Sequence, residues 1–199
     1  ANKIVDTIKT DSNPEGKFLH PTTNQRQHLC ITGGEPLMVT GQMAFIGIYQ
    51  ELERQDNLPG SITFETNGTQ KLSPGFKEFI KRIDTEVFFS VSPKLFTVSG
   101  EKTEKAIKPE IVAEYRELSD KGQLKFVVGH KEREWKEMEE AIVKFKSVGV
   151  DWPVWVMPVG AREEEQTTSA GAVAEKAFKR GYNVAARVHV YLFGNAIGT

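Results

Sequence analysis

The chain has 199 residues, of which 39% are apolar and 27% are charged, and its formal net charge is −1. This near-neutral charge provides no field to attract a nucleic-acid backbone or an anionic membrane, and no apolar stretch is long enough to span a bilayer. The single cysteine, Cys30, excludes an intramolecular disulfide and any metal site built from several thiolates of these residues. Because the first residues show no signal-peptide pattern, we expect a cytoplasmic protein with no nucleic-acid or membrane partner.

Helical and strand patterns alternate along the first half of the chain. The expected elements are a helix end near 4–8, a strand at 29–31, a helix at 39–55, a strand at 61–64, a helix around 76–83 and a strand at 87–91. Cys30 falls within the apolar run at 29–31, which indicates a small buried residue rather than a reactive thiol. We expect the polar residues from 65 onward to follow the strand at 61–64.

The same alternation continues in the second half. The expected elements are a polar loop at 97–108, a helix opened by Pro109, a strand at 124–128, a helix around 135–145, a strand at 154–157, a helix after 163–165 with Phe178 on its apolar face, and a strand at 184–188. This order predicts parallel strands joined by right-handed crossovers. We expect an α/β fold of about six strands by periodicity, in one domain over 1–199. An open parallel sheet and a partial (β/α) barrel both agree with the pattern.

Polar residues gather at the carboxyl ends of the expected strands, where both of these architectures bind ligands. They are the sets 32–35, 65–69, 92–94 and 158–160, together with His189, which closes the last expected strand. Because the strands are parallel, we expect these sets to meet at one rim and to form one site.

The most specific stretch is Thr32-Gly33-Gly34-Glu35-Pro36, between the strand at 29–31 and a helical pattern that begins near 37. Two glycines let the backbone leave a strand sharply and bring bare N–H groups against a ligand. The fixed φ of Pro36 suits the first turn of a helix. The carboxylate of Glu35 suits a ligand that carries an ammonium group. The alternative interpretation is an ordinary tight turn with a surface glutamate.

The other polar sets have ordinary interpretations beside the functional ones. Glu65 suits ribose hydroxyls or an amino group, and it equally suits a solvated rim. Ser92-Pro93-Lys94 presents a hydroxyl and a cation that suit a carboxylate or a ribose, although a proline there also simply ends a strand. A histidine such as His189 is more often a hydrogen-bonded structural residue than a ligand contact.

The succession of these motifs resembles the 7-carboxy-7-deazaguanine synthases, a family of radical S-adenosylmethionine (SAM) enzymes. The stretch 32–36 is similar to the Gly-Gly-Glu motif of radical SAM enzymes. The resemblance runs from about Leu29 to the end of the chain, and the order and spacing of the motifs carry it. The other motifs are Glu65-Thr66-Asn67-Gly68-Thr69, Val91-Ser92-Pro93-Lys94, Lys125-Phe126-Val127-Val128, and His189 with the short tail.

The resemblance implies a partial (β/α) barrel of the radical SAM type. It implies a lyase that converts 6-carboxy-5,6,7,8-tetrahydropterin into 7-carboxy-7-deazaguanine with release of ammonia, in queuosine-type or archaeosine-type deazapurine biosynthesis. The implied cofactors are SAM, a [4Fe-4S] cluster and Mg²⁺. The implied partners are the pterin substrate, an electron donor such as flavodoxin or ferredoxin, and a second copy of the chain in a homodimer.

The resemblance also assigns ligands to positions of this sequence, with none assigned to catalysis or to a metal. Glu35 would meet the SAM amino group, and Met157 replaces a glutamine that is frequent in the family. The positions assigned to SAM are Gly33, Gly34, Glu35, Glu65, Ser92, Pro93, Lys94, Met157, Pro158, Val159 and Gly160, and those assigned to the pterin are Thr32, His189 and Thr199, the last if it is the true C-terminus.

One departure from the family concerns the cluster. The family holds it with three cysteines of one loop, and these residues contain none of them. In the family, the first strand, a substrate-binding arginine and a Mg²⁺-binding threonine lie in the same region as that cysteine loop. We expect the cluster ligands upstream of this sequence. The alternatives are a radical SAM activase and a cluster-less, non-catalytic scaffold that binds SAM or a pterin.

Overall fold

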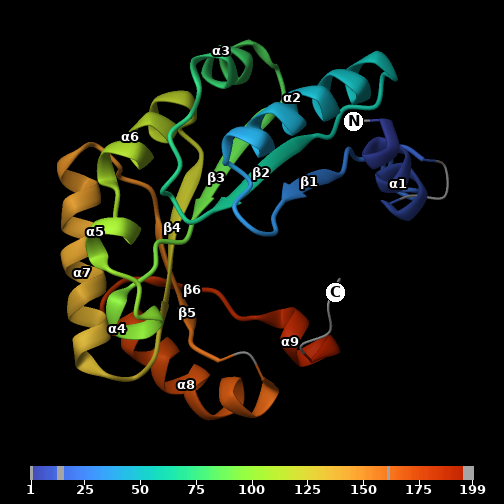
Figure 1. Ribbon diagram of the computed structural model, residues 1–199. Coiled ribbons are helices and arrows are strands. Elements are labelled where there is room, and N and C mark those ends of the chain that lie inside the picture. The colour runs from blue at the N-terminus through green and yellow to red at the C-terminus, as the bar shows by residue number, and fades with distance from the viewer. Residues whose placement is uncertain (1, 13–15, 161, 195–199) are drawn as a thin grey trace. The chain divides into compact units, whose positions relative to one another are not determined.

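The computed structural model describes residues 2–12, 16–160 and 162–194, in which helices and strands alternate along the chain (Figure 1). The strands are β1 (His28–Ile31), β2 (Ser61–Thr66), β3 (Glu86–Val91), β4 (Gly122–Val128), β5 (Val154–Pro158) and β6 (Asn183–Val184). The helices are α1 (Asn2–Ser12), α2 (Val39–Arg54), α3 (Pro74–Arg82), α4 (Phe96–Ser99), α5 (Thr103–Ala106), α6 (Pro109–Leu118), α7 (Glu132–Ser147), α8 (Glu163–Lys179) and α9 (Val188–Phe193).

Six parallel strands of the described residues form one sheet in the order β1-β2-β3-β4-β5-β6. The registers show the parallel pairing directly: Leu29 lies opposite Ile62, Phe126 opposite Val156, and Val156 opposite Val184. Within the described ranges no pairing closes the sheet into a ring. The expected α/β architecture, a partial barrel of about six parallel strands, is therefore confirmed. None of the described helices is both long enough and apolar enough to cross a bilayer.

The chain divides into two compact units. The first unit comprises Ala1–Thr66, Gln70–Ser90 and Glu114–Lys121, and the second comprises Asn67–Thr69, Val91–Ala113 and Gly122–Thr199. The boundary falls inside the motif at 65–69, so that Glu65 and Thr66 belong to the first unit and Asn67 to the second. The expectation of a single domain over 1–199 stays a prediction.

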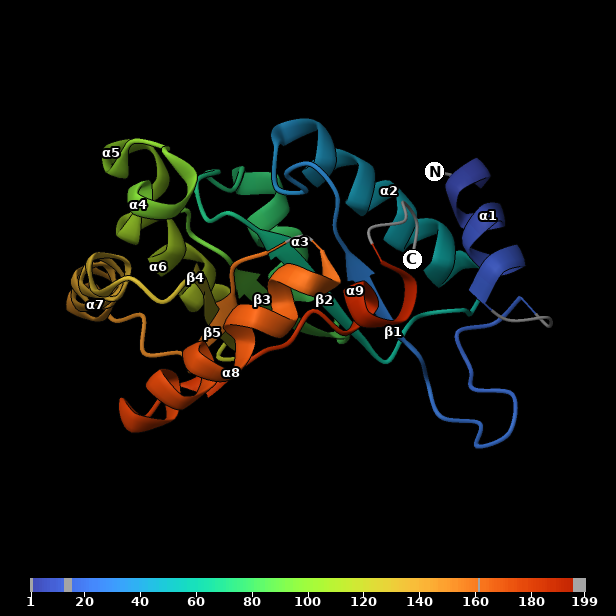
Figure 2. The same ribbon diagram turned by 90° about the horizontal axis from the view of Figure 1, so that it is seen from below.

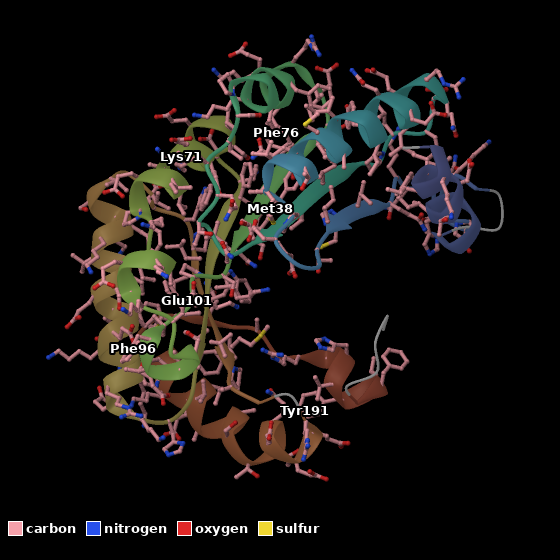
Figure 3. All side chains as sticks on the ribbon, in the orientation of Figure 1. Met38, Lys71, Phe76, Phe96, Glu101 and Tyr191 are labelled. Carbon is pink, nitrogen blue, oxygen red and sulfur yellow. The ribbon has the colours of Figure 1, made fainter. Side chains whose placement is uncertain are left out.

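An aromatic cluster forms the core of the first unit and holds α2 and α3 against β2. Phe64 of β2 has its ring centroid 4.9 Å from that of Phe45 in α2 and 5.8 Å from that of Phe76 in α3. Figure 3 shows Phe76 on α3, the helix beside α2. Because Phe64 is wholly buried by these contacts, the carboxyl end of β2 is fixed relative to the start of α2.

A smaller apolar cluster attaches α1 to the other end of α2, and Figures 1 and 2 both show the two helices side by side. Val5 and Leu52 are wholly buried there and Phe18 is 4% exposed. Leu29 of β1 packs against the same cluster. Of the apolar stripe expected near 4–8, Val5 and Ile8 thus belong to the buried face of α1, whereas Ile4 is 48% exposed.

In the second unit, α7 packs on β4, and α8 packs on β5 and β6. Trp135 of α7 is wholly buried and its Nε1 donates a hydrogen bond to the carbonyl of Gly129, 2.9 Å away. Glu132 of α7 accepts from Arg180 after α8 at 2.8 Å and also pairs with Lys176. These contacts tie α7 to α8 and so position the turns that follow β4 and β5.

The structure corrects two expected elements. The polar segment at 97–108 contains two short helices, α4 and α5. Helix α4 begins where the Glu137 carboxylate of α7 accepts the N–H groups of Phe96 and Thr97, at 2.7 and 2.9 Å. The last strand is only Asn183–Val184, and the apolar residues after it enter α9, because a short apolar run has no period that separates strand from helix.

Side-chain environments differ from expectation at three further positions. Cys30 is exposed, because β1 stands first in the sheet order and only alternate residues of it are covered. Glu65 lies inside β2 and not after it, since the strand continues to Thr66. Phe178 is 66% exposed, and the buried face of α8 consists of Gln166, Val173 and Ala177.

Candidate ligand-binding site

The turn after β1 leaves open space beside two glycines. Gly33 and Gly34 have φ angles of 87° and 54°, in the left-handed region that side chains rarely adopt. A Cβ added at either position would meet nothing within 4 Å. Conformation rather than crowding therefore requires glycine here, and the space beside their backbone is available to a ligand. Thr32, directly before them, is exposed.

The half-buried carboxylate of Glu35 is held in place by two donors of the first unit. Its Oε1 accepts a hydrogen bond from Thr66 Oγ1 at 2.6 Å and one from the backbone N–H of Leu37 at 3.1 Å. Thr66 is the last residue of β2 and only 3% of it is exposed. A carboxylate oriented in this way presents a fixed negative charge at the strand ends, which suits an ammonium group.

Tyr115 lies behind this pair, wholly buried in the first unit. Its hydroxyl donates to the carbonyl of Gln70 at 2.5 Å. Burial raises the pKa of Tyr115 well above its ordinary value, and the negative charge of Glu35 raises that pKa further, whereas the hydrogen bond with Thr66 acts in the opposite direction. Tyr115 therefore stays a neutral donor beside the Glu35–Thr66 pair.

The position of the motif relative to α2 depends on two residues of that helix. A Cβ at Gly41 would lie 2.1 Å from the carbonyl oxygen of Pro36, so only glycine allows the helix to approach the turn this closely. Gln42 is 1% exposed, and its Nε2 donates to the carbonyls of Leu37 and Lys71 at 2.7 and 3.0 Å. Figure 3 shows Lys71 in the segment before α3. Helix α2 begins at Val39, so Pro36 precedes it and does not form its first turn, contrary to expectation.

Glu65 is half-buried on β2, one residue before Thr66. Successive side chains of a strand point to opposite faces, so Glu65 lies on the face opposite to Thr66. The first unit therefore brings Gly33, Gly34 and Glu35 together in one turn, and places Glu65 on the neighbouring strand.

In the second unit, the motif residues Asn67–Thr69 form a tight turn against the end of β3. Asn67 Oδ1 accepts hydrogen bonds from the N–H and the hydroxyl of Thr69 at 2.9 and 2.7 Å. Gly68 has a φ of 79°, and a Cβ there would lie 2.7 Å from Val91 and 3.0 Å from Val112. The glycine of this motif is thus required both by conformation and by packing.

Ser92, Pro93 and Lys94 follow β3 directly. Ser92 is half-buried, Pro93 is buried and Lys94 is exposed. The segment is anchored immediately afterwards, because Leu95 is 2% exposed and Glu137 caps the start of α4 at Phe96, a residue visible in Figure 3. The ammonium group of Lys94 therefore extends from a fixed backbone.

The turn after β5 is held by a glutamine that sequence reasoning did not identify. Gln166 of α8 is wholly buried, and its Nε2 donates to the carbonyls of Pro158 and Gly160 at 3.2 and 2.8 Å. Gly160 has a φ of 137° and leaves no room for a Cβ beside Glu165. Met157 is half-buried, Pro158 buried and Val159 exposed. A glutamine three residues beyond an acidic helix start is a weak signal for such a contact.

A pocket of about 680 Å³ opens beside this turn, entirely within the second unit. Its walls come from the loop after β4, the turn after β5 and the first half of α8. The lining residues include His130, Val159, Gly160, Glu165, Thr168 and Ser169. Two of the positions assigned to SAM, Val159 and Gly160, therefore face a cavity of ligand size. His130 was not expected from the sequence, because it lies two residues after the end of β4, in a charged segment.

His189 occupies a different place from the expected one. It is exposed in α9, five residues after β6, and does not close a strand. Thr199 lies outside the described residues. The remaining predicted positions divide between the units: 32–35 and Glu65 belong to the first, and 92–94, 157–160 and His189 to the second. That all of them meet at one rim stays a prediction.

The residues present fit some of the implied cofactors. The open glycine turn with its oriented carboxylate matches the amino-acid end of SAM, which carries an ammonium group. A three-thiolate cluster does not fit, because the sequence holds one cysteine. In the described ranges no group of three or more His, Cys, Asp or Glu side chains is arranged to hold a metal ion, and nothing there identifies a Mg²⁺ ligand.

Comparison with known proteins supports the motif resemblance. The chain is 28% identical over 183 residues to a 7-carboxy-7-deazaguanine synthase of Rhodopirellula baltica, and the match covers 87% of this chain and 64% of the relative. It is 29% identical over 172 residues to a 7-carboxy-7-deazaguanine synthase of Pyrobaculum aerophilum, covering 86% of this chain and 67% of the relative. The resemblance to this enzyme family is thereby confirmed.

The chain spans about two thirds of the length of the curated relatives it matches. No family model matches the sequence. No solved structure matches it either. The similarity therefore rests on alignments that cover 86–87% of this chain and on the motifs described above.

Proposed function

We propose that these residues are part of a radical SAM lyase that converts 6-carboxy-5,6,7,8-tetrahydropterin into 7-carboxy-7-deazaguanine with release of ammonia. The similarity to two curated synthases of that name supports the proposal. The single observation that carries it is the Glu35 carboxylate, fixed by Thr66 beside the open Gly33–Gly34 turn. The reaction belongs to deazapurine biosynthesis.

In this proposal the first unit holds the amino-acid end of SAM. The carboxylate of Glu35 pairs with the ammonium group, and the N–H groups of Gly33 and Gly34 face the same end of the ligand. When bound beside a [4Fe-4S] cluster, SAM supplies the radical chemistry that begins the reaction. The cluster ligands are proposed to lie outside these residues. Thr66 keeps the Glu35 carboxylate oriented, which reduces the entropy lost when the ligand binds.

Most of the other proposed contacts come from the second unit, whereas Glu65 and Thr32 belong to the first. Lys94 is an exposed cation on an anchored backbone, and Ser92 offers a hydroxyl to the ribose. The pocket beside Val159 and Gly160 takes an apolar or heterocyclic part of SAM. Glu65, Pro93, Met157 and Pro158 line the SAM site, and Thr32, His189 and Thr199 contact the pterin. Mg²⁺, a flavodoxin or ferredoxin electron donor, a cytoplasmic location and a homodimer are further parts of the proposal.

The test uses the full-length protein, reconstituted anaerobically with iron and sulfide. Incubation with SAM, Mg²⁺, a reductant and the carboxytetrahydropterin is expected to yield carboxydeazaguanine, detected by mass spectrometry. Glu35→Gln keeps an acceptor for Thr66 but removes the charge. It is expected to weaken SAM binding about tenfold to a hundredfold, the range for a charge-assisted hydrogen bond. Glu140→Gln changes an exposed glutamate of α7 and is the matched control.

Three outcomes would count against the proposal. If the reconstituted protein binds SAM but forms only a glycyl radical on a partner protein, it is an activase. If SAM or the pterin binds and no turnover of any kind follows, the chain is a non-catalytic scaffold. Equal SAM affinity in Glu35→Gln and Glu140→Gln would remove the observation on which the proposal rests.

A further inference from the structure

Arg187 is a half-buried cation that lacks an anionic partner in the described part of the chain. It stands between β6 and α9, as the residue directly before that helix. Its Nε is buried and has no hydrogen-bond partner among the described residues. None of the ion pairs found within the described residues involves its guanidinium group. Arg180 of the same unit, by contrast, pairs with Glu132 and Glu139.

A half-buried guanidinium group without an anionic partner is expected to bind an anion. The guanidinium group stays charged at every physiological pH, and burial of part of it without a counter-ion is unfavourable. The planar fork of N–H donors matches a carboxylate, which it binds through two parallel hydrogen bonds. Nε is covered by protein atoms, so a ligand carboxylate would meet the other edge that can form such a fork, the one between the two Nη groups.

The strand that precedes Arg187 pairs with the strand whose end lines the pocket. Val184 of β6 lies opposite Val156 of β5, and the N–H of Ala185 continues this pairing by donating to the Val156 carbonyl at 2.9 Å. Arg187 therefore follows the carboxyl end of β6, next to the strand whose end carries Val159 and Gly160. Those two residues line the ligand-sized pocket of the second unit. Arg187 and the pocket thus follow the carboxyl ends of adjacent parallel strands, where ligands bind in such sheets.

We propose that Arg187 is a binding residue for a ligand carboxylate at the end of β6. The inference rests on the proposed function, because that function supplies two ligands that each carry a carboxylate, the pterin and SAM. The motif resemblance assigns neither of them to Arg187. The carboxylates of the pterin and of SAM would form the same paired hydrogen bonds with a guanidinium group. Pairs of ligands that differ only in the carboxylate distinguish between them.

The experiment compares ligands that differ only in the carboxylate. Pterin-6-carboxylate is paired with pterin, and SAM is paired with decarboxylated SAM. Dissociation constants are measured by calorimetry for the wild type, Arg187→Gln and Arg187→Lys, all in the full-length protein. Arg133→Gln is the matched control, because Arg133 is an exposed arginine of the same unit on α7. Thermal unfolding of each variant confirms that it is folded.

For the ligand whose carboxylate Arg187 binds, we expect Arg187→Gln to lose about tenfold to a hundredfold in affinity. The same variant should bind the carboxylate-free partner as the wild type does. Arg187→Lys should fall between, because lysine keeps the charge but not the fork. Loss confined to the pterin pair assigns the substrate carboxylate, and loss confined to the SAM pair assigns the cofactor carboxylate.

The inference and the proposed function fail in distinguishable ways. If the wild type binds both carboxylate ligands and Arg187→Gln binds all four ligands like Arg133→Gln, this inference alone is overturned. If Arg187→Gln weakens each carboxylate ligand and its carboxylate-free partner equally, the role is structural and the inference is again overturned. If the wild type binds none of the four, the proposed function fails and the inference fails with it.

Discussion

The hydroxyl of Thr66 donates a hydrogen bond to the carboxylate of Glu35 over 2.6 Å, although 31 residues separate the two along the chain. Thr66 ends β2 and is 3% exposed, so its hydroxyl has one fixed direction. The contact joins the motif after β1 to the last residue of β2. In the proposed function, it sets the direction in which Glu35 meets an ammonium group.

Replacement of Thr66 by valine should therefore weaken SAM binding. The shape of the side chain is kept, but the Glu35 carboxylate loses a hydrogen bond to a charged acceptor, worth about 1.5–3 kcal/mol. We expect the dissociation constant for SAM to rise about tenfold or more, measured by calorimetry. Thr66→Ser restores the hydroxyl and is the control. Similar affinities for the serine and valine variants would show that the contact does not orient Glu35.

Tyr115 should make stability depend on alkaline pH. Burial raises its pKa in the folded chain, and the charge of Glu35 raises it further. The unfolded chain releases this proton near pH 10, whereas the folded chain retains it to a higher pH. The free energy of unfolding should therefore fall as pH rises above about 10, and its full value is present below that pH. Urea unfolding of wild type and Tyr115→Phe at pH 8 and 10.5 measures this difference.

The phenylalanine variant should lose less stability between the two pH values than the wild type does. It should also be less stable at pH 8, because the carbonyl of Gln70 loses its donor. An equal loss in both chains between pH 8 and 10.5 would contradict the raised pKa.

Gln42 should contribute more to stability than an exposed glutamine of the same helix. Its Nε2 serves the carbonyls of Leu37 and Lys71, and its Oε1 accepts from the N–H of Ser73 at 2.9 Å. Gln42→Ala leaves these groups without their partner at a position that is 1% exposed, and we expect a loss of about 3 kcal/mol or more. Gln50→Ala, on the exposed face of α2, should change stability by less than about 0.5 kcal/mol. Comparable denaturation midpoints for both variants would refute the bridging role.

Alanine substitutions at Gly68 and Gly149 separate the stability cost of backbone strain from the cost of side-chain crowding. Both have a positive φ, of 79° and 85°, but a Cβ at Gly149 would meet nothing within 4 Å. Gly149→Ala should therefore cost about 1–2 kcal/mol, the value for the left-handed conformation alone. Gly68→Ala should cost about 1–3 kcal/mol more, because its Cβ would clash with Val91 and Val112. Adding Val112→Ala should recover part of this difference, and absence of any recovery would show that crowding is not the cause.

Local sequence patterns predict most of the elements and their order along the chain. The apolar spacing on α2, α3 and α7 identifies their buried faces, and the parallel order follows from the alternation of elements. Glycines at a strand end imply a sharp turn, and Gly33 and Gly34 indeed have the left-handed φ angles that such a turn needs. These properties depend on neighbours in the sequence, which is why they could be deduced from it.

Properties that depend on distant partners could not be deduced. Helix α4 exists where Glu137 accepts the N–H groups of Phe96 and Thr97, 40 or more residues away. The roles of Thr66, Gln42 and Gln166 likewise come from contacts between separate elements. His189 was misplaced because an apolar run of a few residues has no diagnostic period. The features that could not be predicted are thus mostly side-chain contacts between separate helices, strands and loops.

Cys30 is exposed on β1, two residues before Thr32. Cys30 is therefore the last residue but one of β1, and the turn with the two glycines begins soon after it. Because these 199 residues contain no second thiol, a maleimide dye or spin label attaches to them at a single known point without mutagenesis. An alkylating reagent at that thiol reports on the adjacent glycine turn, and ligands seated in the turn should slow the alkylation.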